Sequence, residues 1–172
     1  APSQPVSGPF KRAKLNALRV GTPSFVSNPI RDLLVLGSST MKRTSDGDHV
    51  TYGVSSGSPA IFFVYNVDRN SLEKQMYLQS SGGEGVSTAS YAVDVDTITG
   101  VVNIASNGGG VNFYRYHPST DELKYYGKVA SESAVMSRGF VDPVTNDYYF
   151  GTYPNAKLIR YNSKLDKLED LG

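Results

Sequence analysis

The chain has 172 residues, 39% of them hydrophobic, which suffices for one domain with a sizeable core and is too many for a disordered chain. The formal net charge is only +1, and the basic residues are scattered without aromatic neighbours, so we predict no nucleic-acid partner. There is no cysteine, which excludes disulfides and thiolate metal ligands. No apolar run approaches the roughly 20 residues of a membrane-spanning helix, so we predict no membrane contact.

The first 14 residues begin Ala-Pro-Ser-Gln-Pro and predict an N-terminal arm or linker. The same composition fits the new N-terminus left when a signal peptide is removed, which favours a secreted or periplasmic location. Basic residues outnumber acidic ones up to Arg43. We interpret this excess as a solvated polar arm and not as a site for an anionic polymer.

The remaining residues predict an all-β fold. Twelve Tyr, 17 Gly and 9 Pro favour many short strands joined by tight turns, because aromatic residues suit pleated surfaces while Gly and Pro suit turns.

Two sequence marks recur along the chain. A turn of the form Asp-x-x-Thr-Gly/Asn begins at Asp96 and again at Asp142, 46 residues later. Apolar stretches end in Tyr plus a polar residue at Tyr65, Tyr116 and Tyr161, spaced by 51 and 45 residues. A period of roughly 45 residues indicates the four-stranded blades of a β-propeller.

We expect three four-stranded antiparallel blades, at about 29–79, 80–130 and 131–172, within a repeat region 15–172. Their strands are expected at 32–37, 49–54, 60–66 and 73–79, then at 90–95, 101–106, 111–117 and 123–129, and finally at 138–141, 148–152, 157–161 and 167–171. The innermost strand of each blade should be short and apolar. Gly37 and Gly151 each lie at the end of an apolar strand near the crowded blade interior, so Val at either position should overpack this interior.

The segment 151–162 (GTYPNAKLIRYN), followed by 168–172 (LEDLG), resembles blades of secreted and periplasmic β-propellers, including bacterial polysaccharide lyases. The turns 118–121 and 162–165 depart from the usual pattern, since the first has no Gly and the second has neither Pro nor Gly. The resemblance implies a secreted, carbohydrate-active propeller, but its motifs specify blades and not chemistry.

Three blades cannot close a ring, since propellers have at least four. We expect the remaining blades in sequence missing from this chain or on another polypeptide, or else several copies of this chain that assemble together. A β fold other than a propeller is the remaining alternative.

Function should lie on the loops of one end of the ring, where second-to-third strand loops and blade-to-blade loops emerge together. For that end we select as candidate substrate-binding residues Glu84, Asn107, Glu132 and Asn155. Asp96 and Asp142 are expected at the opposite end.

A lyase needs a base that removes a proton beside a sugar carboxylate, and a cation that neutralises this carboxylate. Tyr91 or Tyr153 could be the base, and Arg138, expected at the same end as Tyr153 and opposite Asp96 and Asp142, could be the cation. The alternative is structural: both tyrosines pack between blades and Arg138 pairs with a neighbouring glutamate.

We predict neither a metal nor a cofactor. The only histidines are His49 and His117, too few for a typical transition-metal site. Asp96 and Asp142 each begin a turn, where an aspartate side chain bonds the backbone two residues on, and this favours a turn over a calcium site.

Two functions of different classes therefore remain open. One is a secreted propeller that acts on or binds an acidic polysaccharide, with lyase-type β-elimination as its chemistry. The other is a non-catalytic propeller that serves as a glycan- or protein-binding and assembly module.

Overall fold

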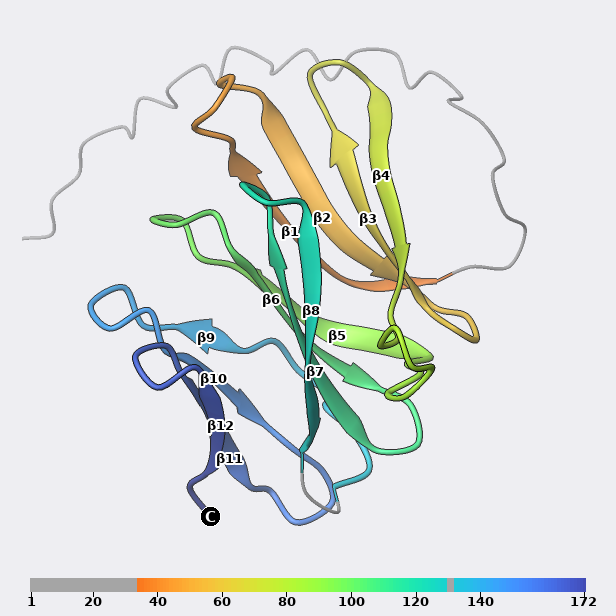
Figure 1. The fold of residues 1–172 in the computed structure, drawn as a ribbon, viewed down its shortest axis with the longest axis vertical. Helices are drawn as coiled ribbons and strands as arrows, with labels where there is room; N and C mark the ends of the chain where they lie inside the picture. Colours follow the sequence, from red (N-terminus) through yellow and green to blue (C-terminus); the bar gives the residue numbers. More distant parts are fainter. Residues whose placement is uncertain (1–33, 130–131) are drawn as a thin grey trace, which may run out of the picture.

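The computed structural model describes residues 34–129 and 132–172, so the predicted arm 1–14 lies outside the described residues. Within these ranges the protein is all-β, without a helix, and its twelve strands form three four-stranded antiparallel sheets (Figure 1). None of these sheets closes on itself. The prediction of an all-β fold with four antiparallel strands per unit is confirmed.

Each sheet is a simple meander in which consecutive strands pair. The first sheet contains β1 (Val35–Lys42), β2 (His49–Ser55), β3 (Ile61–Asn66) and β4 (Ser71–Tyr77); the second contains β5 (Ala89–Val95), β6 (Val102–Asn107), β7 (Val111–His117) and β8 (Glu122–Val129); the third contains β9 (Phe140–Val141), β10 (Tyr148–Gly151), β11 (Leu158–Asn162) and β12 (Lys167–Asp170).

The first strand of the first unit was predicted at 32–37, but β1 runs from Val35 to Lys42. The apolar residues before Gly37 suggested an earlier strand. The strand continues through polar residues because Ser38 to Lys42 pair, residue for residue, with β2. In the third unit the corresponding strand is shorter than predicted, with two paired residues, Phe140 and Val141.

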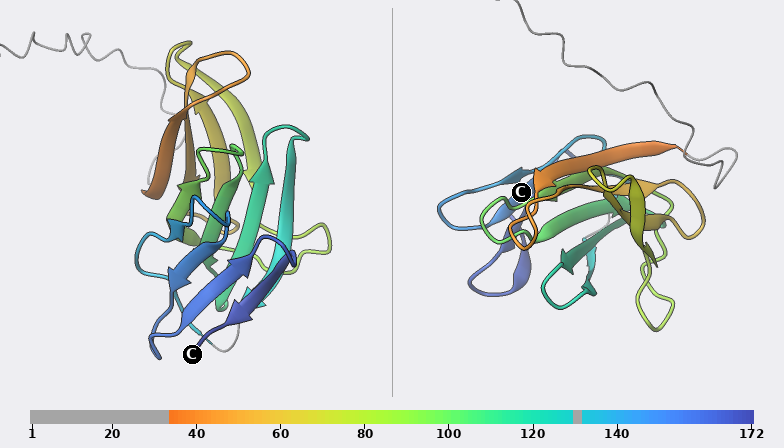
Figure 2. Two further views of the ribbon diagram at one scale, coloured as in Figure 1. Left: turned by 90° about the vertical axis from the view of Figure 1, so that its left-hand side faces the viewer. Right: turned by 90° about the horizontal axis from the view of Figure 1, so that it is seen from above.

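The three sheets follow one another in chain order, with their first strands side by side (Figure 2). β1 lies against β5, and β5 lies against β9. The alternation of β3 illustrates how the packing arises, because Phe62 and Val64 are buried against the second sheet whereas Ile61 and Phe63 face the other way and are half-buried.

Two apolar cores hold the sheets together. The core between the first and second sheets contains Val50, Tyr52, Val54, Phe62, Val64, Val93, Val102, Ile104, Tyr114 and Tyr116. The core between the second and third sheets contains Ala92, Ala105, Phe113, Tyr148, Phe150, Ile159 and Tyr161. The second sheet is therefore covered on both faces, while the first and third sheets are each covered by another sheet on one face.

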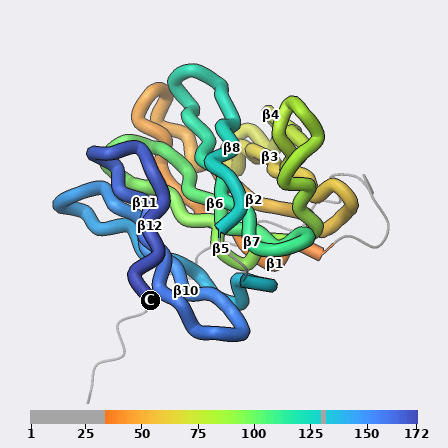
Figure 3. Tube along the Cα trace, turned by 60° about the horizontal axis from the view of Figure 1, so that its bottom comes forward, coloured from red at the N-terminus to blue at the C-terminus, as the bar shows by residue number. Residues whose placement is uncertain are grey.

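Antiparallel order places the connections at two opposite ends (Figures 1 and 3). We name the hairpin end by its turns at 43–48, 67–70, 96–101, 118–121, 142–147 and 163–166, and the loop end by its connections at 56–60, 78–88, 107–110 and 152–157.

The predicted aspartate turns are confirmed. The backbone N–H of Ile98 donates to Asp96 Oδ1 at 2.9 Å, and that of Val144 donates to Asp142 Oδ1 at 2.8 Å. Both turns lie at the hairpin end, where an aspartate side chain replaces a backbone acceptor.

The two glycines selected from the sequence, Gly37 and Gly151, differ in the space available for a side chain. A Cβ at Gly37 would lie 2.8 Å from the backbone oxygen of Tyr91 in β5, so Gly37 permits β1 and β5 to approach closely. A Cβ at Gly151 would meet nothing within 4 Å. The prediction of crowding at Gly151 is therefore wrong, because this residue lies on the face of the third sheet that no other described sheet covers.

In the two described ranges no helix is long and apolar enough to span a membrane.

Candidate functional site

A cavity of about 260 Å³ opens at the hairpin end between the first and second sheets. We call it the hairpin-end cavity. Tyr52 and Tyr116, which are buried in the apolar core between these sheets, lie at its base. Its lining includes Arg43, Thr44, Ser45, Glu73, Lys74, Thr99 and Ser119.

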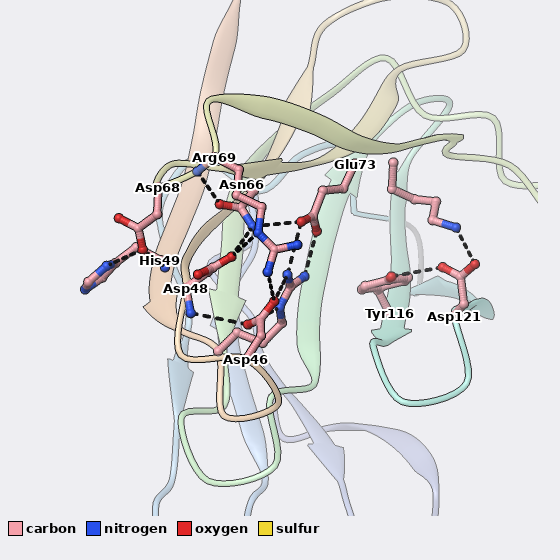
Figure 4. Close-up of polar contacts among 11 residues, drawn as sticks. Asp46, Asp48, His49, Asn66, Asp68, Arg69, Glu73, Tyr116 and Asp121 are labelled. Atoms are coloured by element: carbon pink, nitrogen blue, oxygen red, sulfur yellow. Dashed lines mark hydrogen bonds and ion pairs between the residues drawn. The ribbon is translucent and has the colours of Figure 1, made fainter.

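One side of this cavity is fixed by an ion-pair network centred on Arg43, the residue after β1 (Figure 4). The Arg43 guanidinium donates to both oxygens of Glu73, at 2.6 and 3.0 Å, and to both oxygens of Asp46, at 2.5 and 3.0 Å. Two fork-like carboxylate contacts hold a guanidinium in one orientation. Glu73 comes from β4, so Arg43 ties the first hairpin of the sheet to the second.

The network continues away from the cavity through Asn66, at the end of β3 (Figure 4). The Asn66 amide donates to Asp48 and Glu73, both at 2.8 Å. Arg69 forms an ion pair with Asp48 at 2.6 Å. Arg43, Asp46 and Asp48 of the first hairpin turn therefore all have partners in the network. The network fixes the positions of Arg43 and Glu73, which line the cavity.

The opposite side of the cavity is fixed by a contact between sheets (Figure 4). Lys74 on β4 donates to Asp121 Oδ2 at 2.5 Å, and Tyr116 on β7 donates to Asp121 Oδ1 at 3.0 Å. Asp121 has a backbone φ of 57°, a left-handed conformation that Asp and Asn tolerate better than most residues. The contact therefore joins the first sheet to a turn of the second.

The electrostatics of the cavity favour binding over proton transfer. Burial raises the pKa of Tyr52, and burial together with the hydrogen bond to Asp121 raises the pKa of Tyr116. The hydrogen bonds from Arg43 lower the pKa of Asp46 to about 2. At neutral pH both phenols are thus protonated and this carboxylate is ionised, so the tyrosines are poor bases, and the hydroxyl proton of Tyr116 is already donated to Asp121.

Arg138, the predicted carboxylate-neutralising residue, lies elsewhere. It donates from Nε and Nη2 to Asp94 Oδ1, at 3.0 and 2.9 Å. With Asp96, Thr97 and Phe140 it lines a second cavity of about 350 Å³ between β5 and β9. Arg138 and Asp96 were expected at opposite ends, and this expectation is wrong.

The connection from the second to the third sheet begins at the loop end, but Arg138 lies near its far end, two residues before β9. The chain has already passed Ala134, which pairs with Tyr153, and runs beside β5 toward the hairpin end. Its partner is also an aspartate and not the neighbouring glutamate of the structural alternative. Asp94, in addition, accepts from Tyr148 Oη at 2.7 Å and from the Gly139 N–H at 2.9 Å.

Two of the predicted substrate-binding residues bond each other. The Glu132 side chain is 1% exposed and accepts from the Asn155 amide at 2.7 Å and from Thr152 Oγ1 at 2.9 Å. These hydrogen bonds, that of Asn155 first, lower the pKa of Glu132. The pair closes a loop of the third sheet at the loop end.

Asn107 joins the second sheet to the chain that leads into the third. Its amide donates to the Val135 carbonyl at 3.0 Å, and its Oδ1 accepts from the Val135 N–H at 2.7 Å. Glu84 lies exposed in the loop 78–88, where its backbone N–H donates to Ser80 Oγ. The four predicted substrate-binding residues thus lie at the loop end, three of them in hydrogen bonds that shape this end.

In the described residues no hydrogen bond joins either candidate base, Tyr91 or Tyr153, to Arg138, whose partner is Asp94. Tyr91 lies at a β-bulge of β5, and its backbone faces Gly37. Tyr153 is 60% exposed and pairs through its backbone with Ala134 at the loop end. Neither tyrosine lines the hairpin-end cavity or the cavity beside Arg138. Their catalytic role stays a prediction.

Sequence reasoning missed the residues of the hairpin-end cavity. Their local signal is the charged run from Arg43 to His49. A second signal is the spacing of five residues from Tyr65, Tyr116 and Tyr161 to an Asn or Asp, because each tyrosine hydroxyl donates to that residue. The Arg43 side chain donates to Asp46 in the same turn and to Glu73 in β4, 30 residues away, so sequence spacing alone could not assemble the network.

Among residues 34–129 and 132–172, no group of three His, Asp or Glu side chains is arranged to hold a metal ion. His49 instead bonds Asp68, with Nδ1 and Oδ2 3.0 Å apart. No model of a protein family matches the chain, and no curated protein matches it significantly.

Proposed function

We propose that the three sheets are consecutive blades of a β-propeller and that the hairpin-end cavity binds a glycan without transforming it. The blade arrangement is supported by the adjacent first strands, β1, β5 and β9, which would surround a central channel. It is supported also by the contact that recurs at both junctions: a lysine of one sheet bonds an aspartate in the last turn of the next.

The observation that carries the glycan proposal is the lining of the hairpin-end cavity. Four hydroxyl-bearing residues, Thr44, Ser45, Thr99 and Ser119, line it together with Tyr52 and Tyr116, whose side chains belong to the apolar core and are 1% and 5% exposed. Sugars carry many hydroxyls, so a concave site lined by hydroxyl and charged side chains, with an apolar base, suits them. The network around Arg43 holds the side chains of Arg43 and Glu73 in place before a ligand arrives.

The charges favour a neutral glycan at this cavity. The two cations that line it, Arg43 and Lys74, are already paired with Asp46, Glu73 and Asp121. An acidic sugar would have to compete with those carboxylates. The lyase hypothesis, with Tyr91 or Tyr153 as base and Arg138 as the cation, stays a prediction, as does a secreted or periplasmic location.

The test is titration of the protein with matched neutral and acidic oligosaccharides, by calorimetry and by absorbance of unsaturated products. We expect neutral oligosaccharides to bind and no unsaturated product to form. Ser119→Tyr should fill the cavity and abolish binding, while Ser81→Tyr, in an exposed loop at the other end, should not. Turnover of an acidic oligosaccharide, or equal binding by both variants, would contradict the proposal.

A further inference from the structure

The first and third sheets each have one face that no other described sheet covers, and both faces carry apolar side chains. The free face of the first sheet contains Ile61, Phe63, Tyr65, Leu72 and Tyr77; the free face of the third sheet contains Phe140, Tyr149, Leu158, Arg160, Glu169 and Leu171. Tyr77 and Phe140 are 60% and 61% exposed. Apolar faces of this kind mark an interaction surface.

The two internal junctions show what these faces are built to contact. At the first, Lys74 of the first sheet bonds Asp121 of the second at 2.5 Å; at the second, Lys124 bonds Asp166 of the third at 2.8 Å. In both cases the lysine lies on the outermost strand of the preceding sheet. The aspartate also accepts from a tyrosine of its own sheet, Tyr116 or Tyr161.

Both partners of this contact are replaced at the free faces. Lys124 pairs in register with Arg115, and the corresponding residue of the third sheet, opposite Arg160, is Glu169. In the first sheet the residue that accepts from the tyrosine hydroxyl is Asn70, not an aspartate. Asn70 has a φ of 52°, close to the 57° of Asp121 and the 51° of Asp166, so the three residues occupy equivalent positions.

The two replacements are complementary. Glu169 opposite an aspartate would place two carboxylates together, whereas opposite Asn70 it meets an amide that can donate a hydrogen bond. A lysine-to-glutamate change on one free face is thus matched by an aspartate-to-asparagine change on the other.

An arginine repeats the pattern. Arg115 lies over the ring of Tyr161, 4.2 Å from its centroid, and donates to its hydroxyl at 2.6 Å. Arg160 directly precedes Tyr161 as Arg115 precedes Tyr116, and it lies on the free face of the third sheet. Tyr65, the counterpart of Tyr161, lies on the free face of the first sheet. Packing the third sheet on a first sheet would therefore bring Arg160 to Tyr65.

We propose that the free face of the third sheet packs on the free face of the first sheet of a second copy, and reciprocally, so that two copies close a ring. The inference rests on the proposed propeller arrangement. Propellers have four to eight blades, and six is the multiple of three in that range. A head-to-tail contact that closes after two copies leaves neither face exposed.

The test is the mass of the full chain at micromolar concentration without glycan, by light scattering and sedimentation equilibrium. We expect a dimer, twice the 18.6 kDa chain mass. Asn70→Asp should weaken the dimer at least about tenfold, because it places a carboxylate opposite Glu169 in both contacts. Asp is tolerated at this backbone conformation, as Asp121 and Asp166 demonstrate. Ser81→Asp, which adds the same charge in an exposed loop, should leave the dimer unchanged.

Mixing two variants gives the sharper result. Asn70→Asp and Glu169→Lys chains together can form one wild-type contact and one Lys–Asp contact of the internal kind, so the mixture should form heterodimers where Asn70→Asp alone is monomeric. Circular dichroism of each variant separates dissociation from unfolding. A monomeric wild-type chain, an Asn70→Asp dimer of unchanged stability, or a mixture without heterodimers would overturn the proposal. Glycan binding at the hairpin-end cavity is measured separately and can fail independently.

Discussion

Lys124 Nζ lies 2.8 Å from Asp166 Oδ2, across the junction between the second and third sheets. The same aspartate accepts from Tyr161 Oη at 2.5 Å and from Tyr126 Oη at 2.7 Å. One carboxylate in a turn thus gathers three donors from two sheets. Polar contacts at the hairpin end therefore join the second and third sheets in addition to the apolar core between them.

Removing the Tyr161 hydroxyl should destabilise the fold by about 1.5 to 3 kcal/mol, the usual cost of losing a buried hydrogen bond to a charged partner. This hydroxyl donates to Asp166 and accepts from Arg115, and the tyrosine is 1% exposed. Urea unfolding of Tyr161→Phe measures the effect. Tyr126→Phe is the control, with a smaller expected loss, since its hydroxyl contacts Asp166 at an exposed site. Equal midpoints for wild type and Tyr161→Phe would show that the hydroxyl contributes nothing.

Acid should weaken the junction between the second and third sheets. The hydrogen bond from Lys124, followed by those from the two tyrosines, holds the pKa of Asp166 well below its usual value. A carboxyl whose folded pKa is lowered stabilises the fold above its unfolded pKa of about 3.9, and this contribution is lost as the pH falls toward the folded pKa. Asp166→Asn should therefore be less stable than wild type at pH 7, and the difference should shrink as the pH falls below about 4. A difference independent of pH would exclude this linkage.

Gly37→Val should cost about 1 to 3 kcal/mol, because the added side chain would meet the backbone of β5 and cannot be accommodated by a rotamer change alone. Gly151→Val provides the matched comparison, since a Cβ there meets nothing within 4 Å in the isolated chain. The thermal midpoint of Gly37→Val should therefore lie below that of Gly151→Val. A Gly37→Val midpoint like that of wild type would argue against the close approach of β1 and β5.

Arg43→Ala should destabilise the first sheet by about 1 to 2 kcal/mol, a modest value because the ion pairs are still partly exposed. It leaves Asp46 and Glu73 without their shared cation, so the pKa of Asp46 should rise from about 2 toward its usual range. NMR titration of the carboxyl carbon measures this shift. Arg69→Ala should have a weaker effect, because the Arg69 side chain is 59% exposed. No change in the Asp46 pKa would mean that Arg43 does not control it.

Much of the fold could be predicted from local patterns. The recurrence of Tyr65, Tyr116 and Tyr161 placed the third strand of every sheet, because the alternation of strand residues and the polar turn that follows them are encoded within a few residues. The aspartate turn at Asp96 was predictable for the same reason. The end of β1 was not, since the polar residues Ser38 to Lys42 form a strand only through their pairing with β2.

The candidate site depended almost entirely on tertiary structure. Arg43 and Glu73 are 30 residues apart, and Lys74 and Asp121 are 47 apart, so no local pattern relates them. The position of Arg138 could not be predicted from local patterns either, because its partner Asp94 belongs to the neighbouring sheet. The sequence by itself determined the class of fold, the strands and the turns, which arise from short-range alternation and backbone preferences. Only the packing of one sheet on the next decided which turns meet, and hence where charges and hydroxyls gather around a cavity.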